Sequence, residues 1–238
     1  MNELCPELII NAAAMTNVDL CEEKMDEAYN VNGLALKHIV RLAMKYGSYL
    51  VHVSTDYVFD GFSGNYREES VPNPINFYGL SKLVGDIFVS SYENSLIVRT
   101  SGVYGYLNNF PAFAYNALKA GKSLTAIEDH YSPIHAGNLA KSITYCANNR
   151  LLGTINVAGQ RISRFEFARA IAKYFELDPG LILKGKLSST MKAKRPIDSS
   201  LDIERAKKLI PYDFYSLDSN LKLFSGTVNL ETDRKELN

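Results

Sequence analysis

The chain is 238 residues long, enough for one large domain or for one domain with a smaller lobe. Its 26 basic and 26 acidic side chains cancel, which argues against a nucleic acid polymer as a partner. We find no signal-peptide pattern and no apolar run of the about 20 residues that cross a bilayer, so we expect a cytoplasmic protein with no membrane partner. The scattered Cys5, Cys21 and Cys146 are expected to be reduced thiols rather than disulfides or metal ligands.

The first half of the chain alternates short apolar runs, typical of buried strands, with longer stretches whose apolar residues recur at helical spacing. In chain order this pattern predicts a strand at 7–12, a helix at 30–46, a strand at 49–54, a helix at 77–93 and a strand at 96–99. Strands that alternate with helices in this way favour a parallel sheet with helices on both faces.

The second half is less regular. It predicts helices at 110–120 and 136–148, a strand at 154–157, a helix that ends near 175 and a short helix at 203–210. Ser163 and Glu166 have the spacing of a capping box, in which each side chain bonds the backbone of the other residue at the start of a helix. After Ser216 the chain is polar and charged, so we expect a frayed tail.

Together these elements predict an α/β fold, with a Rossmann-like, doubly wound parallel sheet and a smaller C-terminal lobe that binds substrate. We assign residues 1–104 to the sheet domain, to which strands around 123–158 return, residues 105–215 mainly to the lobe, and residues 216–238 to a polar tail. The lobe would cover the carboxyl ends of the strands, where sheets of this kind bind their ligands.

Tyr78 and Lys82 carry the strongest chemical signal in the sequence. Residues four apart lie on the same face of a helix, so the predicted helix presents the phenol and the ammonium together. A nearby cation favours the phenolate, and a lowered pKa would let Tyr78 exchange a proton with a substrate carbonyl near neutral pH. Taken alone, such a pair is more often a buried tyrosine beside a solvated lysine.

Polar residues at the end of the predicted strand at 49–54 favour a catalytic role for Tyr78 and Lys82. Ser54, Thr55 and Asp56 follow the apolar run directly, and by themselves such residues more often form a turn or a cap. At the carboxyl end of a parallel strand, however, Thr55 would face the place where a substrate carbonyl binds. We therefore interpret Thr55, Tyr78 and Lys82 as the catalytic triad of a reductase.

The sequence around these residues resembles the extended short-chain dehydrogenase/reductases, and among them the dTDP-4-dehydrorhamnose reductase family. The matching segments occur in the family's order and extend to about residue 210. They are residues 9–19, 30–32, 53–61, 78–83, 98–101 and 195–202. The resemblance implies a reductase of a 4-keto nucleotide sugar that uses NADPH or NADH and contributes to nucleotide-sugar and polysaccharide biosynthesis.

The resemblance also implies catalytic roles. Tyr78 would donate the proton, Lys82 would assist Tyr78 and hold the cofactor, and Thr55 would contact the substrate carbonyl.

The spacing of His130 and His135 would suit a metal, but no third ligand is evident in the sequence, so we expect no metal site.

Five further residues match binding positions of the family. Ala14, Met15 and Thr16 would lie along the cofactor, and Asp56 and Tyr57 would contact the substrate together with Thr55. Relatives often dimerise through the helices that correspond to residues 30–46 and 77–93, so the resemblance implies a homodimer.

The chain departs from the family in two places. The family often has a tryptophan after Arg-Thr-Ser that packs on the substrate, where this chain has Gly102. Met1 falls just before the strand that the family places fourth, so the first strands, the glycine-rich turn for the cofactor diphosphate and the residue that selects NAD or NADP would precede it. We expect a misplaced start, with a genuine fragment or a partner that covers the open edge at 8–12 as the alternatives.

Two other functions stay open. Residues 56–61 and 66–69 also resemble the beta regulatory subunit of methionine adenosyltransferase, which keeps the fold and binds a partner. Alternatively, the chain by itself is an inactive fragment. Cofactor binding would separate an enzyme from such a fragment, and co-purification with a synthetase would favour the regulatory subunit.

Overall fold

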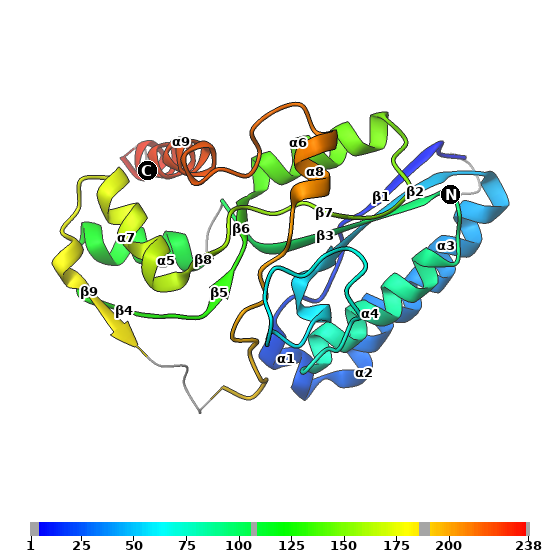
Figure 1. The fold of residues 1–238 in the computed structure, drawn as a ribbon, viewed down its shortest axis with the longest axis horizontal. Coiled ribbons are helices and arrows are strands. Elements are labelled where there is room, and N and C mark those ends of the chain that lie inside the picture. Colours follow the sequence, from blue (N-terminus) through cyan, green and yellow to red (C-terminus); the bar gives the residue numbers. More distant parts are fainter. Residues whose placement is uncertain (1–4, 106–108, 186–190, 237–238) are drawn as a thin grey trace.

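A computed structural model of the protein describes residues 5–105, 109–185 and 191–236. Its centre is a parallel five-stranded sheet of β1 (Leu8–Asn11), β2 (Tyr49–Thr55), β3 (Ser95–Tyr104), β6 (Pro133–His135) and β7 (Gly153–Asn156). β1, β2 and β3 lie in that order, and β6 and β7 both pair with β3 (Figure 1). The predicted α/β fold with a parallel sheet is confirmed.

The centre of the sheet, in β2 and the first part of β3, is buried on both faces, and alternate residues there supply two separate cores. In β2, Tyr49 and Val51 pack into one core, while Leu50 packs into the other with Ile97 of β3. Successive side chains of a strand point to opposite faces, so a strand covered on both sides is mostly apolar. This explains the continuous apolar runs of the sequence.

Helices cover both faces of the sheet (Figure 1). On one face lie α3 (Ala35–Tyr46) and α4 (Phe77–Ser90), with α1 (Val18–Glu23), α2 (Met25–Ala28) and the π-helical turn η1 (Tyr29–Leu34) beside α4. On the other face lie α6 (Ala136–Asn148) and α8 (Glu204–Leu209). The helix predicted at 30–46 therefore begins with a π-helical turn.

The remaining elements form the smaller lobe. Its helices are α5 (Phe110–Lys119), α7 (Arg164–Tyr174) and α9 (Leu217–Glu236), with the short turn η3 (Pro179–Leu181). Its strands pair in twos, β4 (Leu124–Ile127) with β9 (Ile182–Gly185) and β5 (His130–Tyr131) with β8 (Ile162–Ser163). The chain therefore returns to the main sheet at β6 rather than near residue 123, while the proposed domain boundaries stay a prediction.

The predicted capping box opens α7. The backbone N–H of Glu166 donates to Ser163 Oγ at 3.1 Å, and the backbone N–H of Ser163 donates to Glu166 Oε2 at 2.9 Å. Two backbone donors that the helix leaves free are satisfied in this way. The start of α7 is thus set by local sequence.

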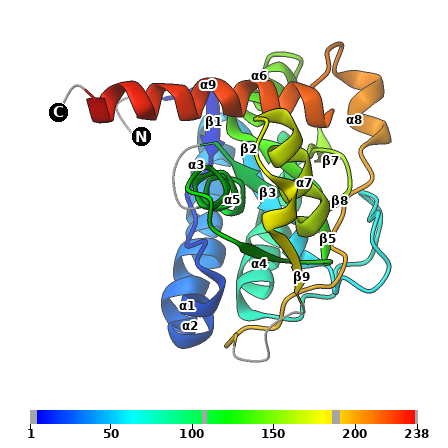
Figure 2. The same ribbon diagram turned by 90° about the vertical axis from the view of Figure 1, so that its left-hand side faces the viewer.

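The expectation of a frayed polar tail after Ser216 is wrong as far as Val228. α9 begins at Leu217 and buries Leu221, Phe224 and Val228 in the core of the lobe. Figure 2 shows this helix lying along the lobe beside α5 and α7. Spacings of three and four residues place the buried side chains on one helix face. Because most of the other residues of the segment are polar or charged, its composition does not reveal this stripe.

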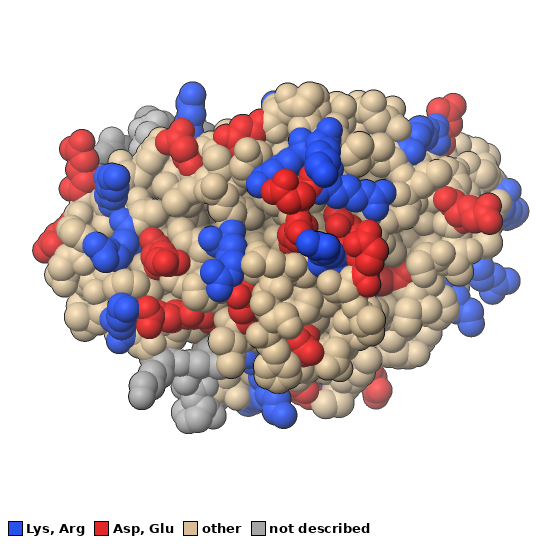
Figure 3. Space-filling model, viewed as in Figure 1, with Lys and Arg blue, Asp and Glu red and all other residues tan. Residues whose placement is uncertain are grey.

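Charges of both signs are interspersed on the face of the molecule that Figure 3 shows. Ion pairs of the described chain join Arg161 to Asp198 at 2.7 Å and Lys207 to Glu204 at 2.8 Å. No basic stripe of the kind that follows a nucleic acid backbone crosses this face. Within the described part of the chain, no helix has the length and apolar character needed to cross a membrane.

Candidate active site

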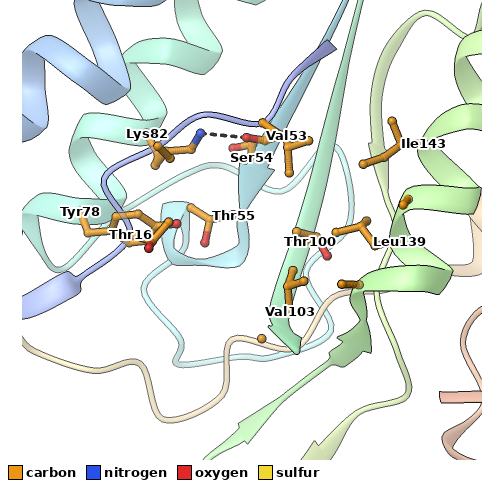
Figure 4. Close-up of a pocket in the computed structure, with 15 residues that line it drawn as sticks. Thr16, Val53, Ser54, Thr55, Tyr78, Lys82, Thr100, Val103, Leu139 and Ile143 are labelled. Atoms are coloured by element: carbon orange, nitrogen blue, oxygen red, sulfur yellow. Dashed lines mark hydrogen bonds between the residues drawn. The ribbon is translucent and has the colours of Figure 1, made fainter. Parts of the chain in front are cut away.

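The carboxyl ends of β2 and β3 open into a cavity of about 500 Å³ between α4 and α6 (Figure 4). Most of its wall is apolar, with a few polar groups at the strand ends and on α4. It is lined by Ala12, Ala14, Thr16, Val53, Ser54, Thr55, Tyr78, Lys82, Thr100, Gly102, Val103, Ala136, Leu139, Ala140 and Ile143. The three residues of the predicted triad therefore line one cavity.

Tyr78 is held in the first turn of α4. Asn76 caps this helix by accepting from the backbone N–H of Gly79 at 2.8 Å. The amide of Asn76 also donates to the backbone oxygen of Lys194 at 3.0 Å, which ties the helix start to a distant segment. The ring of Tyr78 meets the ring of Tyr57 edge to face, with 5.8 Å between centroids. These contacts set the direction of the phenol.

Gly79 allows α4 to approach the end of β2 closely. A Cβ at this position would lie 2.0 Å from the backbone oxygen of Tyr57 and 3.0 Å from Pro74 Cβ. Because the first contact is with backbone, the strain cannot be relieved by rotating a side chain. We expect Gly79→Ala to lower the free energy of unfolding by about 1–3 kcal/mol, measured by denaturant titration.

The matched control for this substitution is Gly226→Ala. Gly226 is exposed in α9, and a Cβ there would meet nothing within 4 Å. Alanine loses less backbone entropy than glycine, so this variant should be more stable by about 0.5–1 kcal/mol. Equal effects of the two substitutions would contradict the close approach of α4 to the end of β2.

The structure corrects the prediction that Lys82 lowers the pKa of Tyr78. Burial raises the pKa of Tyr78 above its usual value, and nearby Asp56 raises it further, while a hydrogen bond with the Thr55 hydroxyl opposes the rise. The reason is the direction of the ammonium. Lys82 Nζ donates to the backbone oxygen of Val53 at 2.8 Å, on the neighbouring strand (Figure 4). Tyr78 therefore keeps its proton at neutral pH, as a proton donor requires.

Lys82 itself is almost fully buried, with 2% of its surface exposed. Burial lowers its pKa to about 8, and the charge of Asp86 partly opposes this shift. At pH 7 most of the side chain is still an ammonium. The cavity therefore contains one positive charge that a modest rise in pH would remove.

The buried carboxylate of Asp86 partly compensates the positive charge of Lys82. Asp86 Oδ2 accepts from Ser54 Oγ at 2.9 Å and lies 3.6 Å from Arg99 Nε. Burial raises the pKa of Asp86, and the Arg99 guanidinium opposes the rise. Asp86 and Arg99 thus compensate each other beneath the strand ends.

Thr55 lies at the cavity, but Asp56 does not line it. Thr55 Oγ1 donates to Asp56 Oδ1 at 3.1 Å, and the other carboxylate oxygen accepts from Ser101 Oγ at 2.7 Å and Ser199 Oγ at 2.5 Å. Asp56 is 3% exposed and joins three segments of the chain. Its geometry is that of a structural link, and its contact with substrate stays a prediction.

Tyr57 also lies outside the cavity lining, on the side of Tyr78 that faces the lobe. Burial raises the pKa of its phenol, and a hydrogen bond with Arg164 of α7 opposes the rise. Arg164 in turn pairs with Asp129 and lies over the ring of Tyr131 at 4.7 Å. Tyr57 therefore connects the sheet domain to the lobe beside the predicted proton donor.

The segment predicted to lie along the cofactor is brought to the cavity by Asn32. Ala14 and Thr16 line the cavity, whereas Met15 does not. The buried Asn32 clamps the backbone of Met15, accepting from its N–H at 2.8 Å and donating to its oxygen at 3.0 Å. Asn32 also lies 3.0 Å from Ser81 Oγ of α4. The loop after β1 is thus fixed relative to Tyr78.

Several residues that line the cavity were not predicted from the sequence as residues of the site. Thr100 comes from the end of β3, and its buried Oγ1 has no hydrogen-bond partner. Its position at a strand end beside Ser101 is a signal that the sequence does contain. Leu139 and Ile143 reach the cavity from α6, and no local pattern connects them with β2.

The chemistry of the cavity lining suits a heteroaromatic ring with a sugar attached. Its wall is mainly apolar, the Thr100 hydroxyl is buried without a partner, and Lys82 can supply a further N–H. Ligand sites commonly combine such a wall with a few polar groups that fix orientation. Among the described residues, no three His, Cys, Asp or Glu side chains form a group that would hold a metal ion.

Comparison with known proteins agrees with this arrangement. Residues 1–225 match the model of the RmlD substrate binding domain. The chain belongs to this family. A solved structure described as a hypothetical dTDP-4-dehydrorhamnose reductase from Sulfolobus tokodaii is 49% identical, with a TM-score of 0.86 over 91% of this chain and 79% of that one.

Two further relatives bear on the activity of this RmlD-family chain. A dTDP-4-dehydrorhamnose reductase from Bacillus anthracis, solved in complex with NADP, is 31% identical, with a TM-score of 0.87 over 94% of this chain and 81% of that one. The methionine adenosyltransferase 2 subunit beta of Bos taurus is 31% identical over 86% of this chain and 65% of its own length. Enzymes and a subunit of an enzyme are thus both similar to it.

Proposed function

We propose that the chain is an NADPH- or NADH-dependent reductase of a 4-keto nucleotide sugar, with dTDP-4-dehydrorhamnose as the first candidate substrate. One observation carries the proposal: a protonated phenol, a strand-end hydroxyl and a buried ammonium line the same cavity. The family and the NADP complex of a relative support it.

The residues divide the chemistry between them. The cofactor, when bound, supplies the hydride that reduces the carbonyl carbon. The Thr55 hydroxyl, which donates to Asp56 Oδ1 in the structure, would turn to donate to the carbonyl oxygen instead, and the O–H bond of Tyr78 breaks as its proton passes to that oxygen. Lys82 donates to Val53 rather than to the phenol, and its ammonium would hold the cofactor beside Tyr78. The product is an alcohol on the sugar.

The cofactor would be held by residues from both halves of the cavity. Lys82 and Thr100 offer an ammonium and a hydroxyl to its ribose and its amide, and Ala14 and Thr16 contribute the loop wall. Met15 belongs to the same loop and would contribute backbone. Asp56 and Tyr57, which we also propose as substrate contacts, lie next to Thr55 and Tyr78.

The direct test mixes the purified protein with reduced nicotinamide cofactor and dTDP-4-dehydrorhamnose. We expect oxidation of NADPH or NADH that depends on the sugar nucleotide, followed by its absorbance. dTDP-glucose, which has no ketone, should give none. Absence of turnover together with absence of saturable cofactor binding would mean that the chain by itself is an inactive fragment.

The pH dependence of the reaction follows from Lys82. The reactive form contains the ammonium, and burial lowers the pKa of Lys82 to about 8. We therefore expect kcat/KM, which reports groups of the free enzyme, to be level below this pH and to fall about tenfold per pH unit above it. Steady-state rates between pH 6 and 10 measure this, and a flat profile to pH 10 would contradict the role of Lys82.

The regulatory function is the second candidate, because a methionine adenosyltransferase subunit is about as similar as the enzyme from Bacillus anthracis. Its test is co-elution of the purified chain with a methionine adenosyltransferase catalytic subunit. We expect no complex. A stable complex without cofactor turnover would replace the reductase proposal.

We further propose a cytoplasmic homodimer. Its contact would use the outer faces of α3 and α4, where Met44, Leu80 and Ile87 are exposed. Light scattering of the eluted protein should give twice the monomer mass, and Ile87→Glu should convert it to a monomer.

A further inference from the structure

His52 is a polar side chain in the middle of a buried apolar strand. It belongs to β2, is fully buried, and lies beneath the cavity rather than in its lining. Its Nε2 atom lies 3.2 Å from Lys82 Nζ, and its Nδ1 atom lies 3.0 Å from the Asn11 side-chain amide. An apolar residue would fill this position equally well, so the two polar contacts indicate that His52 has a role beyond packing.

His52 Nε2 also lies 3.6 Å from Asp86 Oδ1, which is beyond hydrogen-bond distance, so Lys82 is its hydrogen-bond partner. An ammonium has three N–H donors and no acceptor, so the His52 Nε2 atom that faces Lys82 has to accept. A neutral imidazole that accepts at Nε2 carries its proton on Nδ1. The Asn11 amide oxygen then accepts a hydrogen bond from this N–H, because the oxygen and the nitrogen of a side-chain amide can exchange places. Burial, and then the charge of Lys82, hold the pKa of His52 well below its usual value, so the ring is neutral.

The same donors and acceptors orient the ammonium. One N–H of Lys82 donates to the backbone oxygen of Val53 at 2.8 Å, and a second donates to His52 Nε2. Both acceptors belong to β2, and Lys82 lines the cavity (Figure 4). The third N–H is thereby left for a ligand in the cavity. A lysine side chain has four rotatable bonds, and two anchors on one rigid strand restrict it far more than one would.

We propose that His52 is a positioning residue, which accepts one N–H of Lys82 so that another faces the ligand in the cavity. This proposal rests on the proposed function, because that function gives Lys82 its purpose. In this arrangement the Asn11 amide oxygen accepts from the Nδ1–H of His52.

Loss of the His52 acceptor would change the charge of Lys82. The charged or titratable groups that face it are His52 of β2 and Asp86 of α4, with Arg99 of β3 behind Asp86. Loss of an acceptor disfavours the ammonium, so the pKa of Lys82, already lowered to about 8, should fall further. Activity should then be lost at a lower pH.

Two variants separate positioning from packing. In His52→Gln the side-chain amide reaches the place of Nε2 and can accept from Lys82. In His52→Asn the amide reaches the place of Nδ1 and can bond Asn11 but not Lys82. We expect His52→Asn to lower kcat/KM by about tenfold to a hundredfold and to move the alkaline limb to lower pH. His52→Gln should recover most of the rate and restore the limb.

The matched control is His38→Gln, because His38 is exposed on α3. It should match the unsubstituted protein in rate and pH profile. Thermal unfolding of each variant separates a loss of folded protein from a loss of positioning. Equal loss in His52→Gln and His52→Asn, or an unchanged pH profile in His52→Asn, would overturn the proposal.

Nuclear magnetic resonance supplies a readout that does not depend on turnover. The chain has four histidines, so the His52 signals of ¹⁵N-labelled protein are those missing from His52→Gln. We expect a protonated Nδ1 and a bare Nε2, and a lower pKa of Lys82 in His52→Asn, with its signal identified by its loss in Lys82→Met. A protonated Nε2 would overturn the proposal. Inactivity of the unsubstituted protein with the expected spectra would instead refute the proposed function.

Discussion

Tyr78→Phe should lower kcat for the reduction of dTDP-4-dehydrorhamnose by about 10²- to 10⁴-fold, the range that general acid catalysis contributes. The substitution removes the only atom of Tyr78 that can give a proton to the substrate. The ring stays in place, since its edge-to-face contact with Tyr57 and its position after the Asn76 cap do not involve the hydroxyl. The effect should therefore fall on kcat and leave the affinity for NADPH nearly unchanged.

Steady-state kinetics and a cofactor titration by fluorescence measure these two quantities. Tyr29→Phe is the matched control, because Tyr29 is exposed in η1, outside the cavity lining. It should keep full activity. A Tyr78→Phe variant with more than about a tenth of the original rate would show that another group supplies the proton, and the assignment of Tyr78 would then fail.

Asp86→Ala should lower the free energy of unfolding by about 3–5 kcal/mol, which is the usual cost when one partner of a buried ion pair is removed. Asp86 is 3% exposed, and it faces Arg99, which is 6% exposed. Without the carboxylate, the charges of Arg99 and Lys82 would stay buried with no compensating anion. Ser54 would also lose the acceptor for its hydroxyl. Denaturant titration followed by circular dichroism measures the loss.

Asp26→Ala serves as the control for this substitution. Asp26 is exposed in α2, where removal of a carboxylate should change stability by less than about 0.5 kcal/mol. Replacing the pair together, as in Asp86→Leu with Arg99→Met, should recover much of the loss because no unpaired Arg99 charge remains. A loss below about 1 kcal/mol for Asp86→Ala would mean that water reaches Arg99 and compensates it.

Local order in the sequence determined most of the sheet domain. β2 and β3 could be predicted because a strand buried on both faces is mostly apolar, and α4 because its apolar residues recur at helical spacing. The same spacing placed Tyr78 and Lys82 on one helix face, and the end of β2 placed Thr55 beside them. Each of these inferences uses residues that are close in the chain.

The directions in which the charged side chains of the site point depend on the tertiary structure and could not be predicted from the sequence. The spacing of Tyr78 and Lys82 suggested that the ammonium acidifies the phenol, but Lys82 donates to Val53 and His52 instead, and burial raises the pKa of Tyr78. Likewise Asp56 is engaged by Ser199, which lies 143 positions away in the chain.

The burial of α9 likewise could not be predicted from the sequence. Leu221, Phe224 and Val228 became visible as a core-facing stripe only when the lobe supplied a surface to bury them. Sequence spacing determines which side chains share a face. The pKa of a buried group and the partner of a polar atom depend instead on the solvent and the neighbours that remain after distant segments have packed together.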